Sequence, residues 1–379
     1  MQGSLFPDDE PPAPPPRKSS KGSKDSQRAG DESEATPAGR QRRGVQAIVP
    51  TPALQALAAS LPPGLHLGTS SWHFPGWKGL VWQDEHAGSK LSREGLAAYA
   101  QHPLLRSVSL DRAFYQPLSV LQYMRYAQQV PDDFRFVVKA PALVADALVR
   151  GEQGQGRQLN AAFLDPALAV ESFIRPAVEG LGAKAGVLVF QISPLPARWL
   201  QDMPGLLDRL SALLAAVRQA LEANVAQHGL AAAPVVAVEV RDAAFLQPGV
   251  APQLAAVLKQ HGATYCLGLH AKMPPIEDQL FMLRALWPGP MVCRWNLHRK
   301  HGAYGYEAAK ALYEPFDRLH DVDERTRQEL ARVIQGTTSR GWPAFVTINN
   351  KAEGSAPLSV QALAELATGQ GHAQRLSPR

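Results

Sequence analysis

Short apolar runs alternate with longer amphipathic segments along most of this chain. The short runs are rich in Val, Ile, Leu and Phe, as buried strands are, and the longer segments have the three- to four-residue apolar spacing of helices. The runs predict strands at 65–69, 107–110, 134–138, 187–191, 235–240, 264–269, 291–295 and 344–348. The longer segments predict helices at 52–61, 91–100, 119–129, 166–179, 201–228, 252–261, 277–286, 306–312, 324–336 and 359–367.

Each of the eight predicted strands is followed by a predicted helical segment. This alternation is the pattern of a (β/α)₈ TIM-type barrel, and the roughly 320 residues it spans are a fitting length for one. A doubly wound open sheet is the alternative. No Gly-x-Gly-x-x-Gly turn or Walker loop follows any of the strands to favour it. We therefore predict a single α/β barrel domain over residues 48–379.

Residues 1–47 have a different composition, rich in Pro, Ser, Gly and mixed charge, which predicts a disordered tail. Its apolar island is Leu5-Phe6. Together with Gln2, these residues resemble the short peptide by which bacterial replication and repair proteins dock on the β sliding clamp. We interpret residues 2–6 as a possible clamp-binding peptide on a flexible tether, with Gln2, Leu5 and Phe6 as the contact residues.

Charge, cysteines and the N-terminal sequence restrict the class of protein only broadly. The chain has a formal net charge of +5, of which the tail contributes +1 from eight Lys/Arg and seven Asp/Glu in residues 1–45, so an anionic partner is permitted but not required. Cys266 and Cys293 lack metal-ligand spacing and are predicted to be buried free thiols. There is no signal-peptide pattern or membrane-spanning run, so we expect a cytoplasmic protein without membrane association.

Candidate chemistry is concentrated where the predicted strands end, because TIM-barrel sites are built at the carboxyl ends of the strands. Glu239 and Arg241 lie two positions apart on one strand and therefore point the same way. They could form a structural ion pair or belong to a site. The polar or aromatic candidates at or near strand ends are Trp72, Asp111, Tyr115, Lys139, Gln191, Glu239, Arg241, Arg294, Asn349 and Asn350.

These residue types indicate roles for a phosphate-bearing or otherwise anionic substrate. Arg241 and Arg294 suit bidentate capture of an anion, and Lys139 could be an anion ligand, a Schiff-base amine or a partner of Glu239. Glu239 and Asp111 are the candidate proton-transfer groups, provided that Arg241 does not neutralise Glu239. The remaining candidates supply stacking rings (Trp72, Tyr115) and hydrogen-bonding amides (Gln191, Asn349, Asn350), although the asparagines could equally cap the last loop.

No cofactor is predicted. A metal held by Asp111, Glu239, His270 and His298 is an alternative, but no local spacing supports it, and three nearby cations oppose it.

Several ordered motifs carry a resemblance to a known family. The chain resembles the YecE-like family, also called domain of unknown function 72, in the segments Gly68-Thr69-Ser70-Ser71-Trp72, Gly76-Trp77-Lys78-Gly79, Phe114-Tyr115, Phe136-Val137-Val138-Lys139-Ala140-Pro141, Val189-Phe190-Gln191, Val238-Glu239-Val240-Arg241 and Asn349-Asn350 with Gly354 and Ala356. The resemblance runs from about residue 65 to 365 and implies a TIM-type barrel. It implies no established activity.

The chain departs from that family in two strands. Ser109 and Asp111 stand where members usually carry a Glu and an Asn, and Asn296 to His298 replace a His-Gly that follows the strand-seven Arg. Our leading interpretation is an enzyme, a metal-independent hydrolase or lyase acting on a phosphate-bearing substrate such as a nucleotide or nucleic acid, with a link to DNA replication or repair. A non-catalytic binding barrel and a carbohydrate-active enzyme using Asp111 and Glu239 are the alternatives.

Overall fold

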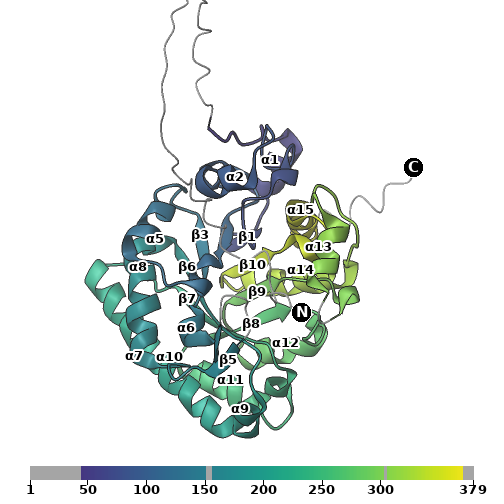
Figure 1. The fold of residues 1–379 in the computed structure, drawn as a ribbon. Helices are drawn as coiled ribbons and strands as arrows, with labels where there is room; N and C mark the ends of the chain where they lie inside the picture. Colours follow the sequence, from purple (N-terminus) through teal and green to yellow (C-terminus); the bar gives the residue numbers. More distant parts are fainter. Residues whose placement is uncertain (1–43, 151–155, 303–304, 370–379) are drawn as a thin grey trace, which may run out of the picture.

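The computed structural model describes residues 44–150, 156–302 and 305–369. Eight parallel strands close into a barrel in the order β1, β2, β3, β6, β7, β8, β9 and β10, with β10 paired back to β1. The helices lie around the outside of this barrel (Figure 1). The predicted TIM-type α/β fold is thereby confirmed.

Strand boundaries follow the apolar runs closely. The barrel strands are β1 (Leu65–Thr69), β2 (Ser107–Leu110), β3 (Arg135–Lys139), β6 (Ala185–Ile192), β7 (Val235–Val240), β8 (Thr264–Leu269), β9 (Met291–Trp295) and β10 (Ala344–Ile348). Six match the predicted bounds; β3 is shifted by one residue and β6 extends beyond its apolar run. These strands are buried on both faces, which is why their sequences are nearly continuous in apolar residues.

The helices lie where they were predicted, but some of the predicted helices are interrupted. They are α1 (Pro52–Ala59), α2 (Gly88–Glu94), α3 (Leu96–Tyr99), α4 (Arg112–Tyr115), α5 (Val120–Ala127), α6 (Ala142–Ala145), α7 (Pro166–Ala169), α8 (Arg175–Leu181), α9 (Ala197–Gln201), α10 (Met203–His228), α11 (Ala251–Gln260), α12 (Ile276–Ala285), α13 (Tyr306–Tyr313), α14 (Glu324–Thr338) and α15 (Ala356–Ala367). The predicted helix at 91–100 is interrupted at Gly95, and a π-helical turn, η3 (Val170–Ile174), separates α7 from α8.

Short 3₁₀ turns occur in several connections: η2 (Pro75–Trp77), η4 (Gly182–Lys184), η5 (Ala243–Leu246), η6 (Arg299–His301) and η7 (Asn350–Ala352). All but η4 follow the carboxyl end of a barrel strand. Ser119 caps α5: the Ser119 hydroxyl accepts from the Gln122 backbone N–H, and the Gln122 side chain accepts from the Ser119 backbone N–H in return.

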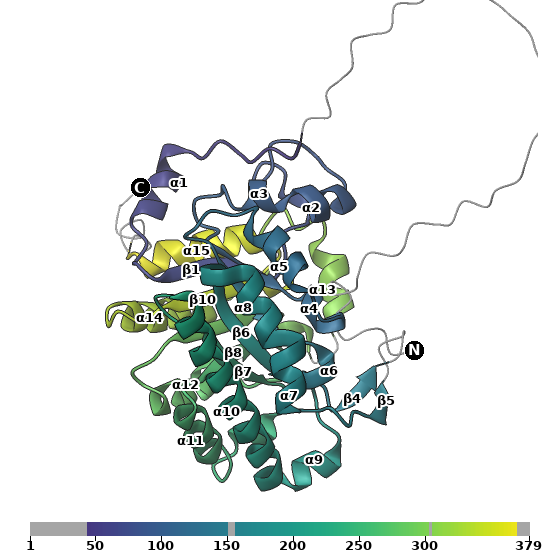
Figure 2. The same cartoon turned by 90° about the vertical axis from the view of Figure 1, so that its left-hand side faces the viewer.

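Two local features were not predicted. Between β3 and β6 the chain forms an antiparallel hairpin of β4 (Leu148–Arg150) and β5 (Gly156–Leu159), which stands off the barrel on the side of α4 and α6 (Figure 2). In addition, residues assigned to the tail join the folded body: Ala47 bridges Trp82, and the Gln83 backbone N–H donates to the Gln46 carbonyl. Gln2, Leu5 and Phe6 of the clamp-like peptide lie outside the described residues.

The barrel interior contains one compact apolar layer. It is formed by inward-facing side chains from six strands: Val137, Val187, Val189, Ala237, Cys266, Val292 and Phe345. Cys293 belongs to the larger core between strands and helices, and both cysteines are buried free thiols, as expected. Among the described residues, none of the helices is long and apolar enough to cross a membrane.

Candidate functional site

A polar cluster lies directly above the apolar layer, at the carboxyl end of the barrel. Side chains alternate faces along a strand, so residues two positions beyond the layer also face the interior. These are Lys139 after Val137, Gln191 after Val189, Glu239 after Ala237 and Arg294 after Val292. The register places Gln191 beside Glu239. The alternation that fills the lower barrel with apolar side chains therefore directs these polar groups inward.

Arg294 is the centre of this cluster. Its Nη1 donates to Glu239 Oε2 at 2.7 Å and to Gln191 Oε1 at 2.9 Å, and its Nη2 donates to Asp111 Oδ2 at 2.7 Å. Only 2% of the arginine is exposed. One guanidinium thus joins strands β6, β7 and β9 to the end of β2, in the planar geometry that suits carboxylate partners.

Glu239 and Arg241 form the ion pair that their spacing allowed. Arg241 Nη2 lies 2.7 Å from Glu239 Oε1 and donates to Gln191 Oε1 at 2.9 Å. Both oxygens of Glu239 therefore meet an arginine, and the residue is fully buried. Room for this carboxylate comes from Gly268 on the neighbouring strand β8, where a Cβ would lie 3.2 Å from the Glu239 side chain.

The ion pairs determine the protonation state of the two carboxylates. Burial by itself raises the pKa of Glu239, but Arg241 and Arg294 outweigh it and leave the pKa below its ordinary value. Asp111 shows the same balance: burial raises its pKa, while Arg294, Lys139 and a 2.6 Å hydrogen bond from Ser109 lower it overall. Both groups are therefore carboxylates at neutral pH, and Arg294 is held in its charged form, with a pKa well above the ordinary value.

Lys139 completes the cluster and is 1% exposed. Its Nζ lies 3.7 Å from the centroid of the Phe114 ring, a cation–π contact with the first turn after β2. Its charge also helps to lower the pKa of both Asp111 and Glu239.

The predicted aromatic and amide residues are divided between the mouth and its supporting structure. Trp72 is buried and donates its indole N–H to the Leu91 carbonyl, whereas Tyr115 is partly exposed. Asn349 donates to the Ser70 hydroxyl at 2.9 Å. Asn350 accepts from the Trp77 indole and from the Ala356 backbone, so it ties the last loop to the start of α15.

The histidines near the mouth that the structure describes do not assemble into a metal centre. Within the described ranges, no three His, Cys, Asp or Glu side chains are grouped as metal ligands. Asp111 and Glu239 are instead bound to arginine, and burial together with Arg241 and Lys272 lowers the pKa of His270 to about 3. His270 is thus neutral, and its Nδ1 accepts from the Lys272 backbone N–H, which leaves Nε2 as the protonated nitrogen.

Lys351 is a candidate that the sequence reasoning missed. It follows Asn350 in the last loop and is completely buried, with Nζ 4.6 Å from the Tyr306 ring centroid and 5.6 Å from that of Phe316. Burial lowers its pKa to about 7. Its position at a strand end was the available signal, but nothing in the local sequence indicated that aromatic rings would surround the amine.

Fold and site together define a class: a TIM-like barrel with a buried, arginine-centred polar cluster at the carboxyl ends of its strands. A family model described as "Protein of unknown function DUF72" matches residues 66–379. The chain belongs to this family, as its motifs indicated. No match was found among curated proteins.

One solved structure supports the fold. A DUF72 family protein from Enterococcus faecalis V583 is 16% identical, with a TM-score of 0.52, and the alignment covers 83% of this chain and 97% of that one. A second structure of that family protein is 14% identical with a TM-score of 0.48, covering 83% and 98%. At such identities, the first likeness concerns the fold alone.

Proposed function

We propose that this barrel binds a phosphate-bearing substrate at the carboxyl ends of its strands and acts on it as a metal-independent hydrolase or lyase. The supporting observation is the charge of the cluster. Among these five side chains, Lys139, Arg241 and Arg294 carry three positive charges in their ordinary states, while Asp111 and Glu239 carry two negative charges. A buried surplus of positive charge is costly and favours an anionic ligand.

The contacts divide the cations into two roles. The guanidinium of Arg294 already donates to Asp111, Glu239 and Gln191, so its role is to hold these three side chains in position. Arg241 follows the end of β7, one residue beyond the strand, and Glu239 and Gln191 fix its Nη2. In this proposal Arg241 and Lys139 hold the anion, and Glu239 positions Arg241.

The lowered pKa values restrict proton transfer. Neither carboxyl holds a proton at neutral pH, so each can serve as a base and neither as an acid. Asp111 is 8% exposed and Glu239 is fully buried, which favours Asp111 as the base. A glycoside hydrolase needs one protonated carboxyl. The carbohydrate alternative is therefore the least favoured.

A non-catalytic anion-binding barrel is the second candidate. It is favoured by the same ion pairs, because carboxylates engaged by arginines stabilise a binding surface more readily than they transfer protons. Asp111→Asn separates the two candidates once a ligand is known. An enzyme loses turnover in Asp111→Asn while retaining affinity, whereas a binding protein has no turnover to lose.

Thermal unfolding with added ligands tests the proposal directly. We expect inorganic phosphate, a mononucleotide or a sugar phosphate to raise the Tm, and the matched nucleoside and free sugar to leave it unchanged; a ligand at 100 times its Kd adds about 2.7 kcal/mol. Arg241→Gln should remove the shift, and Arg175→Gln, an exposed arginine at the start of α8, should retain it. Equal shifts with charged and uncharged ligands, or an unchanged shift in Arg241→Gln, would contradict the proposal.

The preference for a nucleotide or nucleic acid rests on the clamp-like peptide of the tail. Binding of the full chain to purified β sliding clamp tests this link. Leu5→Ala/Phe6→Ala should abolish the interaction, and Pro14→Ala/Pro15→Ala in the same tail should preserve it. Unchanged binding by the first pair would remove the connection to DNA replication and repair.

A further inference from the structure

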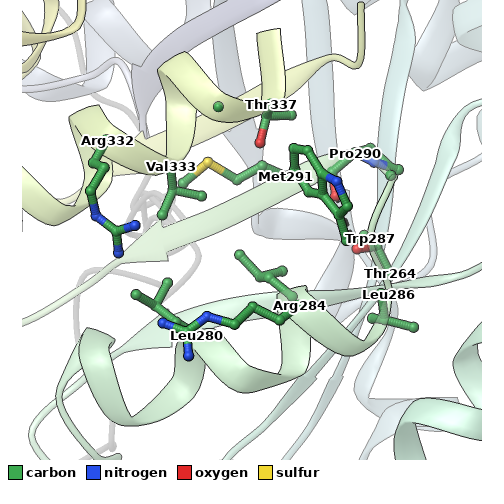
Figure 3. A pocket seen from close by; sticks show the side chains of 13 residues that line it. Thr264, Leu280, Arg284, Leu286, Trp287, Pro290, Met291, Arg332, Val333 and Thr337 are labelled. Atoms are coloured by element: carbon green, nitrogen blue, oxygen red, sulfur yellow. Dashed lines mark hydrogen bonds between the residues drawn. The ribbon is translucent and has the colours of Figure 1, made fainter. Parts of the chain in front are cut away.

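A second site candidate lies at the opposite end of the barrel from the polar cluster. A cavity of about 390 Å³ is located between α12 and α14, next to the first residues of two strands, Thr264 of β8 and Met291 of β9 (Figure 3). This volume falls within the roughly 300–1,000 Å³ of small-molecule pockets. The cavity is therefore large enough for a ligand of its own.

The walls of this cavity combine apolar surface with two arginines. Leu280, Leu283, Leu286, Val333, Met291 and Trp287 supply the apolar part. The guanidinium groups of Arg284 and Arg332 both lie at the end of the view opposite Trp287 and Pro290 in Figure 3. The lining is thus apolar at one end and positively charged at the other.

The two arginines differ in their present contacts. Arg332 contacts Glu329 through Nε at 3.1 Å and Nη2 at 2.6 Å. Arg284 lies on the facing helix and forms no ion pair within the described part of the chain. This end of the cavity therefore carries more positive than negative charge.

Gly336 keeps one wall of the cavity open. It lies within α14 and lines the cavity, and a Cβ built on it would meet no atom within 4 Å. Glycine inside a helix is unfavourable by roughly 1 kcal/mol relative to alanine. Here its backbone conformation does not require glycine, so the missing side chain has the direct effect of leaving space between the helices.

We propose that this cavity binds an amphipathic carboxylic acid. An aromatic or aliphatic body lies against the leucines and Trp287, and the carboxylate is held by Arg284 and Arg332. An anion without an apolar body would leave the leucines and Trp287 uncovered, and an uncharged body would leave the charge-assisted contacts that Arg284 and Arg332 offer unused. The site is separate from the proposed phosphate site, since the first residues of β8 and β9 contact the cavity and the polar cluster lies at the far ends of the strands.

Isothermal titration calorimetry with 4-phenylbutyrate tests this site in the full chain. The wild type should bind the acid saturably at up to millimolar concentration, and 4-phenylbutan-1-ol at least about tenfold more weakly, because the alcohol lacks the charge-assisted contact. Gly336→Leu places a side chain in the cavity and should weaken binding at least tenfold. Gly336→Ala is the matched control and should bind as the wild type does.

Two further variants locate the anion. Arg284→Gln should weaken binding of the acid about tenfold, whereas Arg241→Gln, at the other end of the barrel, should leave it unchanged. Absence of saturable binding by the wild type, or equal affinity in Gly336→Leu, overturns the site. Equal affinity for the alcohol and the acid overturns the ligand class. Loss of binding in Arg241→Gln places the acid at the carboxyl-end cluster and likewise overturns the proposal.

Discussion

Replacing Arg294 by methionine tests the central contact of the polar cluster. The substitution retains a long side chain but removes the guanidinium that joins Asp111, Glu239 and Gln191. Glu239 keeps Arg241, and Asp111 keeps the hydrogen bond from Ser109. Two buried carboxylates nevertheless lose a charged partner, and breaking a buried ion pair on one side typically costs about 3–5 kcal/mol. Because these other contacts remain, we expect the lower end, about 3 kcal/mol.

Urea unfolding at pH 7 measures this loss, with Arg175→Met as the matched control. Arg175 pairs with Glu171 on the surface, with more than half of its side chain exposed, so its loss should change the free energy of unfolding by no more than about 0.5 kcal/mol. Adding Asp111→Asn to Arg294→Met should recover part of the stability, since it removes one uncompensated charge.

The difference between wild type and Arg294→Met should also depend on pH. The lowered pKa values of Asp111 and Glu239 stabilise the wild-type fold above their unfolded pKa values, and this contribution is lost as the pH falls through the folded values. In the variant, protonation relieves the uncompensated carboxylates. The stability difference should therefore narrow from pH 7 toward pH 4. A loss below about 1 kcal/mol at pH 7, or one that is equal at both pH values, would refute the reasoning.

Three other predictions concern single positions. Burial lowers the pKa of Lys351 to about 7, so between pH 7 and 10 the unfolded chain binds more protons than the folded chain. The free energy of unfolding of the wild type, measured in urea, should therefore rise over that window by up to about 1.4 kcal/mol per pH unit. Lys351→Met should flatten this rise. A Cβ at Gly68 would lie 1.9 Å from the Ser107 carbonyl oxygen, so Gly68→Ala should prevent folding or lower the Tm sharply in calorimetry, while Gly336→Ala should not. Ser119→Ala removes the capping box of α5 and should lower the free energy of unfolding in urea by about 1 kcal/mol. An unchanged free energy of unfolding would show that the capping hydrogen bonds do not stabilise the fold.

The apolar pattern by itself determined the architecture. Strands buried on both faces require short apolar runs, and crossover helices require amphipathic segments between them, so the count of eight and the six exact strand boundaries followed from local sequence. The interruptions at Gly95 and at 170–174 were not predicted because helical periodicity continues through them; backbone hydrogen bonding and packing decide them. The β4–β5 hairpin has no continuous alternating pattern that would have indicated it.

Sequence also placed Asp111, Lys139, Gln191, Glu239 and Arg294 at one end of the barrel, because parallel strands share a direction. The sequence did not predict which charged side chains form ion pairs. Arg294, rather than Arg241, joins the two carboxylates because closure of the barrel brings β9 to face β2 across the interior. The same closure buries Lys351 among aromatic rings from distant segments and opens a cavity beside Gly336. Local sequence fixes the direction in which a side chain points, whereas the partners it meets, and hence its pKa, depend on residues that only the closed tertiary structure brings together.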